Sequence, residues 1–328
     1  MKKTIVALAV LAASGASFAQ NVSMTGTLAY SYTASSANGV EASGFGNDTS
    51  DVYLDASEDL GGGMKIAAAF GVSGLVRAGA VTGTDSTLTL TTGAGTFKTG
   101  LTKGGDYLSG GISGLGGYGL DGRIFGARSV KDFVSFTLPS MSGLTLGLTF
   151  SEASTTNGTG AGVSGASATV GQPTTSISAT YAAGALASNL NYVSYANRTA
   201  ATETSLTSVT RGALSYDLGA VKLGVGASVA LGNGASNNTL TDSIFSLAAP
   251  VGPLTVVGQF GQRTAANYAT SAYNATITGA IVKATYPLSK RTYMTATYGQ
   301  WTAATASTDP TPQANKSSMT EFVLGHSF

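Results

Sequence analysis

The stretch SSMTEFVLGHSF, residues 317–328, ends the chain and alternates in character residue by residue. One side of it, if extended, carries its larger residues: Phe322, Leu324, His326 and Phe328. Successive side chains of a β-strand point to opposite faces, so this period of two predicts a strand with one apolar face. The last element of the chain is therefore a β-strand, and the remaining sequence has to supply the strands that pair with it.

The opposite end of the chain has the pattern of a secretory signal. Lysines at positions 2 and 3 precede an apolar run over residues 5–13, and small residues occupy the −3 and −1 positions before Gln20. We predict a signal peptide over residues 1–19, cleaved before Gln20, followed by a single domain over residues 20–328. The apolar run is shorter than the roughly 20 residues of a transmembrane helix. A retained N-terminal anchor is the alternative.

The composition excludes several classes of protein. The chain has no Cys, so it has neither a disulfide framework nor a thiolate metal site. Without the two lysines of the signal, 15 Lys and Arg face 16 Asp and Glu, which is not the basic balance of a nucleic-acid-binding protein. Charged residues make up only 10% of the chain. Such a low fraction suits a β-barrel whose outer face meets lipid.

Alternation over about ten residues recurs along the chain and is interrupted by turns. Clear examples are residues 144–150, 221–231 and 254–260. Seven short turns, near 59–63, 93–95, 139–142, 183–185, 218–220, 251–253 and 288–290, alternate with eight longer connections, the first near 33–47. This arrangement predicts an all-β fold, a 16-stranded antiparallel transmembrane barrel with short periplasmic turns and long external loops. A secreted β-sandwich or adhesin is the alternative.

Five short segments add a more specific signal. They are SEDLGGGMK (57–65), GTFK (95–98), FTLPSMSGL (136–144), YPLSKRT (286–292) and GHSF (325–328). Together they resemble turns and the chain end of the general trimeric porins of β-proteobacterial type, which are Gram-negative outer-membrane diffusion porins. The resemblance implies a homotrimer in the cell outer membrane, in contact with its lipid and lipopolysaccharide. It also implies that the barrel-assembly machinery reads the terminal strand ending in Phe328.

The third long connection, residues 102–127, stands where such porins fold a loop into the barrel. A barrel of this size encloses a lumen too wide for side chains to fill, so an inward loop would narrow it. The charged residues of this loop are Lys103, Asp106, Asp121 and Arg123. We expect them at a pore constriction. The alternative is an external loop whose charges are solvated.

The parity of each strand assigns charged residues to the pore wall. They are Asp51, Asp55, Lys98, Lys131, Arg211 and Lys283, with Lys65, Lys222 and Arg291 closer to the short turns. By resemblance, arginines commonly stand in the family at the positions of Asp51, Asp55 and Gly325. Cations on the wall favour anions and acids favour cations. We therefore expect a weaker anion preference than is usual for the family.

The sequence gives little support for catalysis. Its single histidine, His326, lies three residues from the chain end and shares the outer face of the last strand with Phe328. A catalytic base needs a nucleophile within reach and access to substrate. We therefore expect no enzyme, no metal site and no cofactor, but a channel for passive diffusion of small hydrophilic solutes and ions. A substrate-specific porin and a non-conducting structural or adhesin barrel are the alternatives.

Overall fold

A computed structural model describes most of the chain. The described residues are 21–37, 39–74, 81–103, 108, 111–112, 119–126, 130–151, 173–196, 206–232, 237–302, 304–306, 309–312 and 316–328. The predicted signal peptide, residues 1–19, lies outside them. No helix in this part of the chain is long and apolar enough to cross a membrane.

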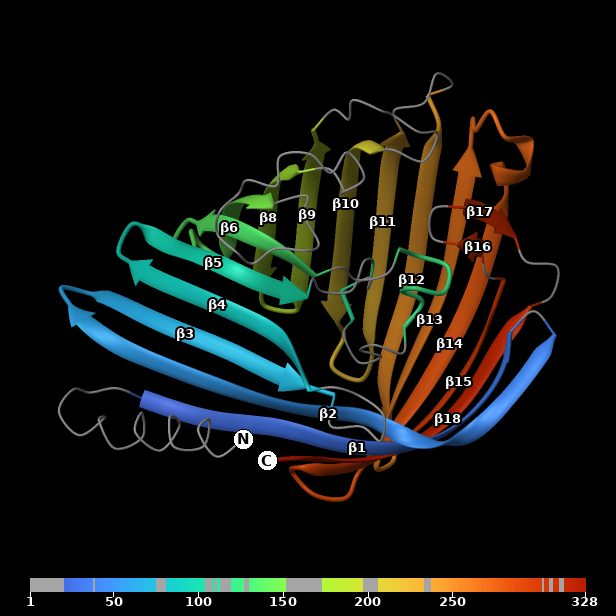
Figure 1. The fold of residues 1–328 in the computed structure, drawn as a ribbon, viewed down its shortest axis with the longest axis horizontal. Coiled ribbons are helices and arrows are strands. Elements are labelled where there is room, and N and C mark those ends of the chain that lie inside the picture. The colour runs from blue at the N-terminus through green and yellow to red at the C-terminus, as the bar shows by residue number, and fades with distance from the viewer. Residues whose placement is uncertain are drawn as a thin grey trace.

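The described chain forms a closed antiparallel barrel of 16 strands, as the alternation predicts (Figure 1). Its strands are β1 (Asn21–Ala37), β2 (Val40–Gly61), β3 (Met64–Ser73), β4 (Thr82–Thr92), β5 (Gly95–Lys103), β6 (Val130–Thr137), β7 (Leu144–Ser151), β8 (Thr174–Ala183), β9 (Leu186–Tyr195), β10 (Leu206–Asp217), β11 (Lys222–Gly232), β12 (Thr239–Val251), β13 (Leu254–Ala266), β14 (Thr276–Pro287), β15 (Thr292–Trp301) and β18 (Ser317–Ser327). A 3₁₀ turn, η3 (Ser271–Tyr273), and a small hairpin of β16 (Ala304–Ala306) and β17 (Asp309–Pro312) lie outside the barrel sheet.

The terminal strand closes the barrel. β18 pairs with β15 on one side and with β1 on the other. Beyond the strand, Phe328 completes the ladder, because its N–H donates to the carbonyl of Gly26 at 3.0 Å and its carbonyl accepts from the Gly26 N–H at 3.1 Å. The alternating segment 317–328 thus forms the closure of the barrel, where the two ends of the chain meet.

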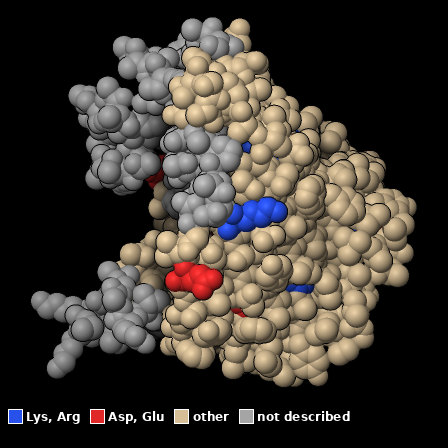
Figure 2. All heavy atoms as spheres, turned by 90° about the vertical axis from the view of Figure 1, so that its right-hand side faces the viewer, with Lys and Arg blue, Asp and Glu red and all other residues tan. Residues whose placement is uncertain are grey.

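The barrel has apolar side chains outside and mostly small or polar ones inside. Residues directly opposite each other in an antiparallel pair share a face. Leu148, Ile177 and Tyr192 are paired in this way on adjacent strands and are 52%, 60% and 48% exposed. The side in Figure 2 likewise shows only isolated charged side chains among uncharged ones. This distribution suits apolar surroundings, because a barrel leaves no unpaired sheet edge to desolvate.

The connections between strands mostly follow the prediction. All seven predicted short turns join neighbouring strands in the barrel. In the β2–β3 turn, Gly61, Gly62 and Gly63 take φ values of 78°, 61° and 79°, which glycine adopts without strain. The predicted long connection near 33–47 is wrong. β1 and β2 stay paired as far as Ala37 and Val40, because backbone hydrogen bonds hold this polar, glycine-containing segment in the ladder without an alternating side-chain pattern.

Candidate functional site

The connection between β5 and β6 turns into the barrel. Of its described residues, Leu108, Ile112, Leu120, Ile124 and Phe125 are at most 5% exposed. They form one apolar cluster with wall residues of β12, β13 and β14, which are Ile244, Val257, Ile277 and Ile281. Figure 1 shows the segment, in green, within the outline of the barrel. The described part of the third connection therefore folds inward, as predicted, and an apolar contact holds it there.

Glycines on the inner face of the wall make room for this contact. At Gly261 in β13, an added Cβ would lie 2.7 Å from atoms of both Leu120 and Phe125. At Gly226 in β11 it would lie 2.9 Å from Leu108. Any side chain at these positions would push the loop away from the wall. This docking surface was not predicted from the sequence, although glycines at lumen-facing positions of β11 and β13 were a signal for it.

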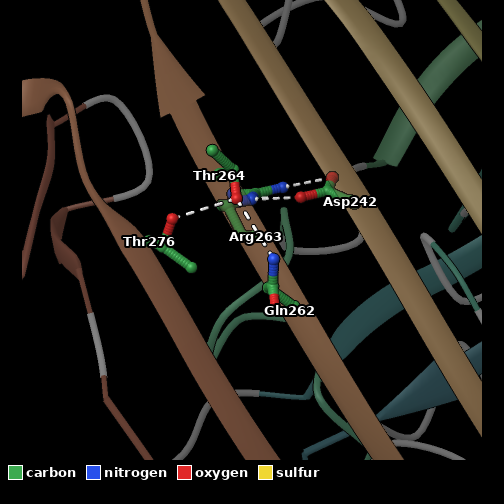
Figure 3. A network of polar contacts seen from close by, with 5 residues as sticks. All are labelled: Asp242, Gln262, Arg263, Thr264 and Thr276. Atoms are coloured by element: carbon green, nitrogen blue, oxygen red, sulfur yellow. Dashed lines mark hydrogen bonds and ion pairs between the residues drawn. The ribbon is translucent and has the colours of Figure 1, made fainter.

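A buried ion pair stands beside the docked loop. Arg263 of β13 donates from Nε and Nη2 to the two carboxylate oxygens of Asp242 in β12, at 2.7 and 2.8 Å (Figure 3). The two side chains are 7% and 0% exposed. The guanidinium carbon of Arg263 also lies 6.0 Å from the ring centre of Phe125. This pair was not predicted from the sequence, although Asp242 and Arg263 lie 9 and 10 residues from the ends of the predicted turn at 251–253.

The inward loop presents one cation toward the closing strands. The guanidinium of Arg123 lies 5.0 Å from the ring centre of Trp301, and it donates to the carbonyl of Gly119 at 2.6 Å. Its Nη2 also lies 3.4 Å from the sulfur of Met319. Burial lowers the pKa of Arg123, whereas the carboxylates of Glu321 and Asp121 act in the opposite direction. Arginine nevertheless stays charged in proteins, so this loop carries a fixed positive charge.

Glu321 of β18 is an acidic residue of the lumen that the sequence analysis did not assign. It pairs with Thr297 and Thr33, is 4% exposed, and accepts a 3.0 Å hydrogen bond from Thr33 Oγ1 at Oε1. Its Oε2 is buried and has no hydrogen-bond partner among the described residues. Arg123, Lys283 and Asp48 all lie within electrostatic range of this carboxylate. The parity that puts Phe322 outside was enough to place Glu321 inside.

A β-bulge brings Asp48 into the same region. Ala29 pairs with Thr49 and Tyr30 with Asn47, so Asp48 has no residue opposite it in β1. Asp48 accepts a 3.0 Å hydrogen bond from Thr49 Oγ1. It lines one hollow of the inner wall together with Glu321. Simple alternation cannot locate such a residue, because a bulge shifts the register by one.

The register places most of the predicted wall residues on the inner face. Asp51 and Asp55 of β2 pair with Thr27 and Ser23 of β1, on the face opposite that of the exposed Val22 and Met24. The other pairs on that face are Lys98 with Thr89 and Ser135, Arg211 with Asn191 and Ser228, and Lys283 with Val257 and Thr297. Lys131 stands opposite Thr102.

The structure does not bring all of these residues together. Of the four predicted constriction residues, Asp121 and Arg123 belong to the docked segment, Lys103 ends β5, and Asp106 lies outside the described residues. β1, β18 and β15 separate Asp51 and Asp55 from the wall strand β14, which carries Lys283. Around Tyr53 the wall is acidic, because Asp51 and Asp85 both lie within electrostatic range of it. The described lumen thus has an acidic stretch on β2 and mixed charges around Glu321.

The outer face and the chain end also match the predictions. His326 points outward with Phe322, Leu324 and Phe328, and its Nδ1 lies 2.9 Å from Thr292 Oγ1. Within the described residues, no group of three or more His, Cys, Asp or Glu side chains could hold a metal ion. The charged side chains of the inner wall can act on passing ions through their charge.

Comparison with known proteins agrees with the barrel fold. The family model of Gram-negative porins matches residues 6–304. No curated protein matches the chain. Among solved structures, the anion-selective porin from Comamonas acidovorans is similar, with 16% identity and a TM-score of 0.71 over 94% of this chain and 100% of that one. OmpF of Salmonella typhi, solved with daunomycin, is 9% identical, with a TM-score of 0.73 over 94% and 97%. The channel DcaP of Acinetobacter baumannii is 13% identical, with a TM-score of 0.68 over the same shares.

Proposed function

This chain belongs to the Gram-negative porin family, whose members are outer-membrane diffusion channels, and on that premise we propose a pore with a weaker anion preference than is usual for the family. The observation that carries the proposal is the acidic inner face of β2. Asp51 and Asp55 point into the lumen there, and Asp85 lies close to Asp51 around Tyr53. Acidic groups on a pore wall attract cations and repel anions.

The closing strand supports the same direction of selectivity. Glu321 adds a buried carboxylate to the lumen side of β18. At Gly325, where the resemblance would put an arginine, an added side chain would overlap the ring of Tyr293. A neutral aromatic residue therefore fills that space. The cations Arg123 and Lys283 lie near Glu321 and offset part of its charge.

Size exclusion in this proposal depends on the inward loop. The docked residues of the β5–β6 connection cover the inner faces of β11 to β14, so the proposed passage lies between the loop and the strands that it leaves uncovered, among them β18, β1 and β2. Lys103, Asp106, Asp121 and Arg123 are the loop charges proposed to border that passage, and Asp51, Asp55, Lys98, Lys131, Arg211 and Lys283 the wall charges. Passage through such an opening is passive and needs no cofactor.

The proposed assembly follows from the family. We expect a homotrimer embedded in outer-membrane lipid and lipopolysaccharide. We also expect the signal peptide over residues 1–19 to direct export and the terminal strand ending in Phe328 to be recognised by the barrel-assembly machinery. Threefold steps in conductance, when one trimer inserts into a planar bilayer, would support the trimer. Insertion in single steps only would contradict it.

The reversal potential across a salt gradient tests the selectivity. Purified protein is inserted into a planar bilayer with KCl at unequal concentrations on the two sides. A reversal potential near zero, or one with the sign of K⁺ preference, supports the proposal. A strong Cl⁻ preference would overturn it, and an absence of open-channel current from correctly folded protein would favour a structural or adhesin barrel.

A further inference from the structure

The inner face of the β1–β2 hairpin and β18 forms an open cavity of about 460 Å³. Its lining includes Ser31, Thr33, Asn47, Asp48 and Glu321. Gly44 and Gly46 stand opposite Thr33 and Ser31 on this face, and an added Cβ at either would meet no atom within 4 Å. The hollow therefore exists because the wall lacks side chains there. Its volume lies in the range of small-molecule sites, roughly 300–1,000 Å³.

We propose that this cavity is a binding station for small hydrophilic solutes that carry a primary ammonium group, with Glu321 and Asp48 as its anionic residues. The inference rests on the proposed channel function and names a class of solute for it. Binding in this cavity makes the passage of such solutes saturable, whereas neutral solutes of equal size pass by simple diffusion.

The unpartnered oxygen of Glu321 is the first reason. A buried carboxylate oxygen without a hydrogen-bond donor is costly, since burying an unsatisfied polar group costs about 1–3 kcal/mol and more for a charged one. Oε1 of Glu321 receives the hydroxyl of Thr33, but Oε2 receives no donor from the described residues. Glu321 lines the cavity and is only 4% exposed. A ligand with an N–H group would satisfy this oxygen.

The balance of charge around the cavity favours a cation over an anion. Asp48 lies within electrostatic range of Asp51 and Lys283, while Glu321 lies within range of Arg123 and Lys283. Asp121 also lies within electrostatic range of Arg123. Four carboxylates therefore face two cations, and a bound cation would offset part of this negative excess.

The types of neighbouring atoms favour an ammonium group over a metal ion. A primary ammonium has three N–H donors, and the cavity offers carboxylate, amide and hydroxyl oxygens to accept them. Calcium takes six to eight oxygen ligands and is usually held by several carboxylates. Only two carboxylates line this cavity, and Lys283 would repel a divalent ion.

Single-channel conductance in ethanolammonium chloride tests the station, with KCl as the reference salt. The wild-type conductance should rise linearly with KCl concentration but saturate with ethanolammonium chloride. Glu321→Gln keeps the shape of the side chain and removes its charge. It should raise the half-saturating concentration about tenfold, the factor expected for one charge-assisted hydrogen bond. Asp59→Asn is the matched control, because it removes one charge from the distant β2–β3 turn, and it should leave saturation unchanged.

Liposome swelling in ethylene glycol, the neutral analogue of ethanolammonium, shows that each variant forms an open pore. Equal swelling by wild type and Glu321→Gln, together with the higher half-saturating concentration of Glu321→Gln, supports the station. Linear conductance of the wild type in ethanolammonium chloride, from channels that conduct KCl normally, would overturn the station and leave the channel intact. A protein that conducts neither salt would overturn the proposed channel function instead.

Discussion

Arg263 and Asp242 form a bidentate ion pair across β12 and β13, with N–O distances of 2.7 and 2.8 Å. The pair lies on the inner face of the wall, and Arg263 also lies 6.0 Å from the ring centre of Phe125 in the inward loop. The same guanidinium thus joins two wall strands and borders the loop. In a barrel whose other inner residues are mostly small, this pair links the register of the wall to the position of the loop.

Removing one member of the pair should strongly destabilise the barrel. Arg263→Met leaves the Asp242 carboxylate buried without its partner, and losses of this kind cost about 3–5 kcal/mol. The free energy of unfolding can be followed in urea through the fluorescence of Trp301, the single tryptophan. The double variant Asp242→Leu with Arg263→Met should recover most of the loss, because no charge is then left buried. Equal stability of wild type and Arg263→Met would contradict this role.

A side chain at Gly261 should displace the inward loop. In Gly261→Leu the new atoms would occupy the space of Leu120 and Phe125, and overpacking of this kind costs about 1–3 kcal/mol. We expect a larger single-channel conductance, because the loop moves away from its contact with the inner wall. Gly258→Leu is the matched control on the same strand, since its added Cβ would meet only one atom, at 4.0 Å. It should leave the conductance unchanged.

The sequence was sufficient for the barrel and for most of its wall. Strict alternation places Asp51 and Asp55 inside and His326 outside, because the side-chain period of a strand is two. It fails at Asp48, where a bulge breaks the period, and at residues 33–47, where two polar strands stay paired. The position of the inward loop against the wall also depends on contacts between segments that are distant in the sequence. Gly261 and Phe125 meet only once the barrel has closed, so no local pattern connects them.

Reversing the two acids of β2 should increase the preference for anions. Asp51→Arg with Asp55→Arg changes the local charge of the inner wall by four units. The reversal potential in a KCl gradient should shift toward Cl⁻ preference, and the neutral pair Asp51→Asn with Asp55→Asn should give about half of that shift. The size of the shift should fall at high salt, where charges are screened. An unchanged reversal potential would show that these residues lie outside the ion path.

Arg123 should reduce the cation preference that the acidic residues of the lumen produce, because it is the fixed cation of the docked loop. Arg123→Met removes its charge beside Glu321 and should move the reversal potential toward K⁺ preference. Arg123→Lys keeps the charge but loses the planar group that lies over Trp301. It should therefore retain the wild-type selectivity while changing the fluorescence of Trp301. If both variants shift selectivity equally, geometry rather than charge is the cause.

Closure of the barrel should depend on the absence of a side chain at Gly26. The ring of Phe328 lies where a Cβ of residue 26 would be, and the carbonyl oxygen of Asp51 lies 2.6 Å from the same point. Gly26→Val would therefore push Phe328 away and weaken the two backbone hydrogen bonds that join the chain ends. We expect slower assembly and a several-fold lower yield of folded barrel. The yield can be measured by the heat-dependent shift of folded protein in gel electrophoresis.

Gly258→Val is the control on the outer face of β13. If deletion of Phe328 in the Gly26→Val background lowers the yield no further, the two changes act at one contact; additive losses would contradict that.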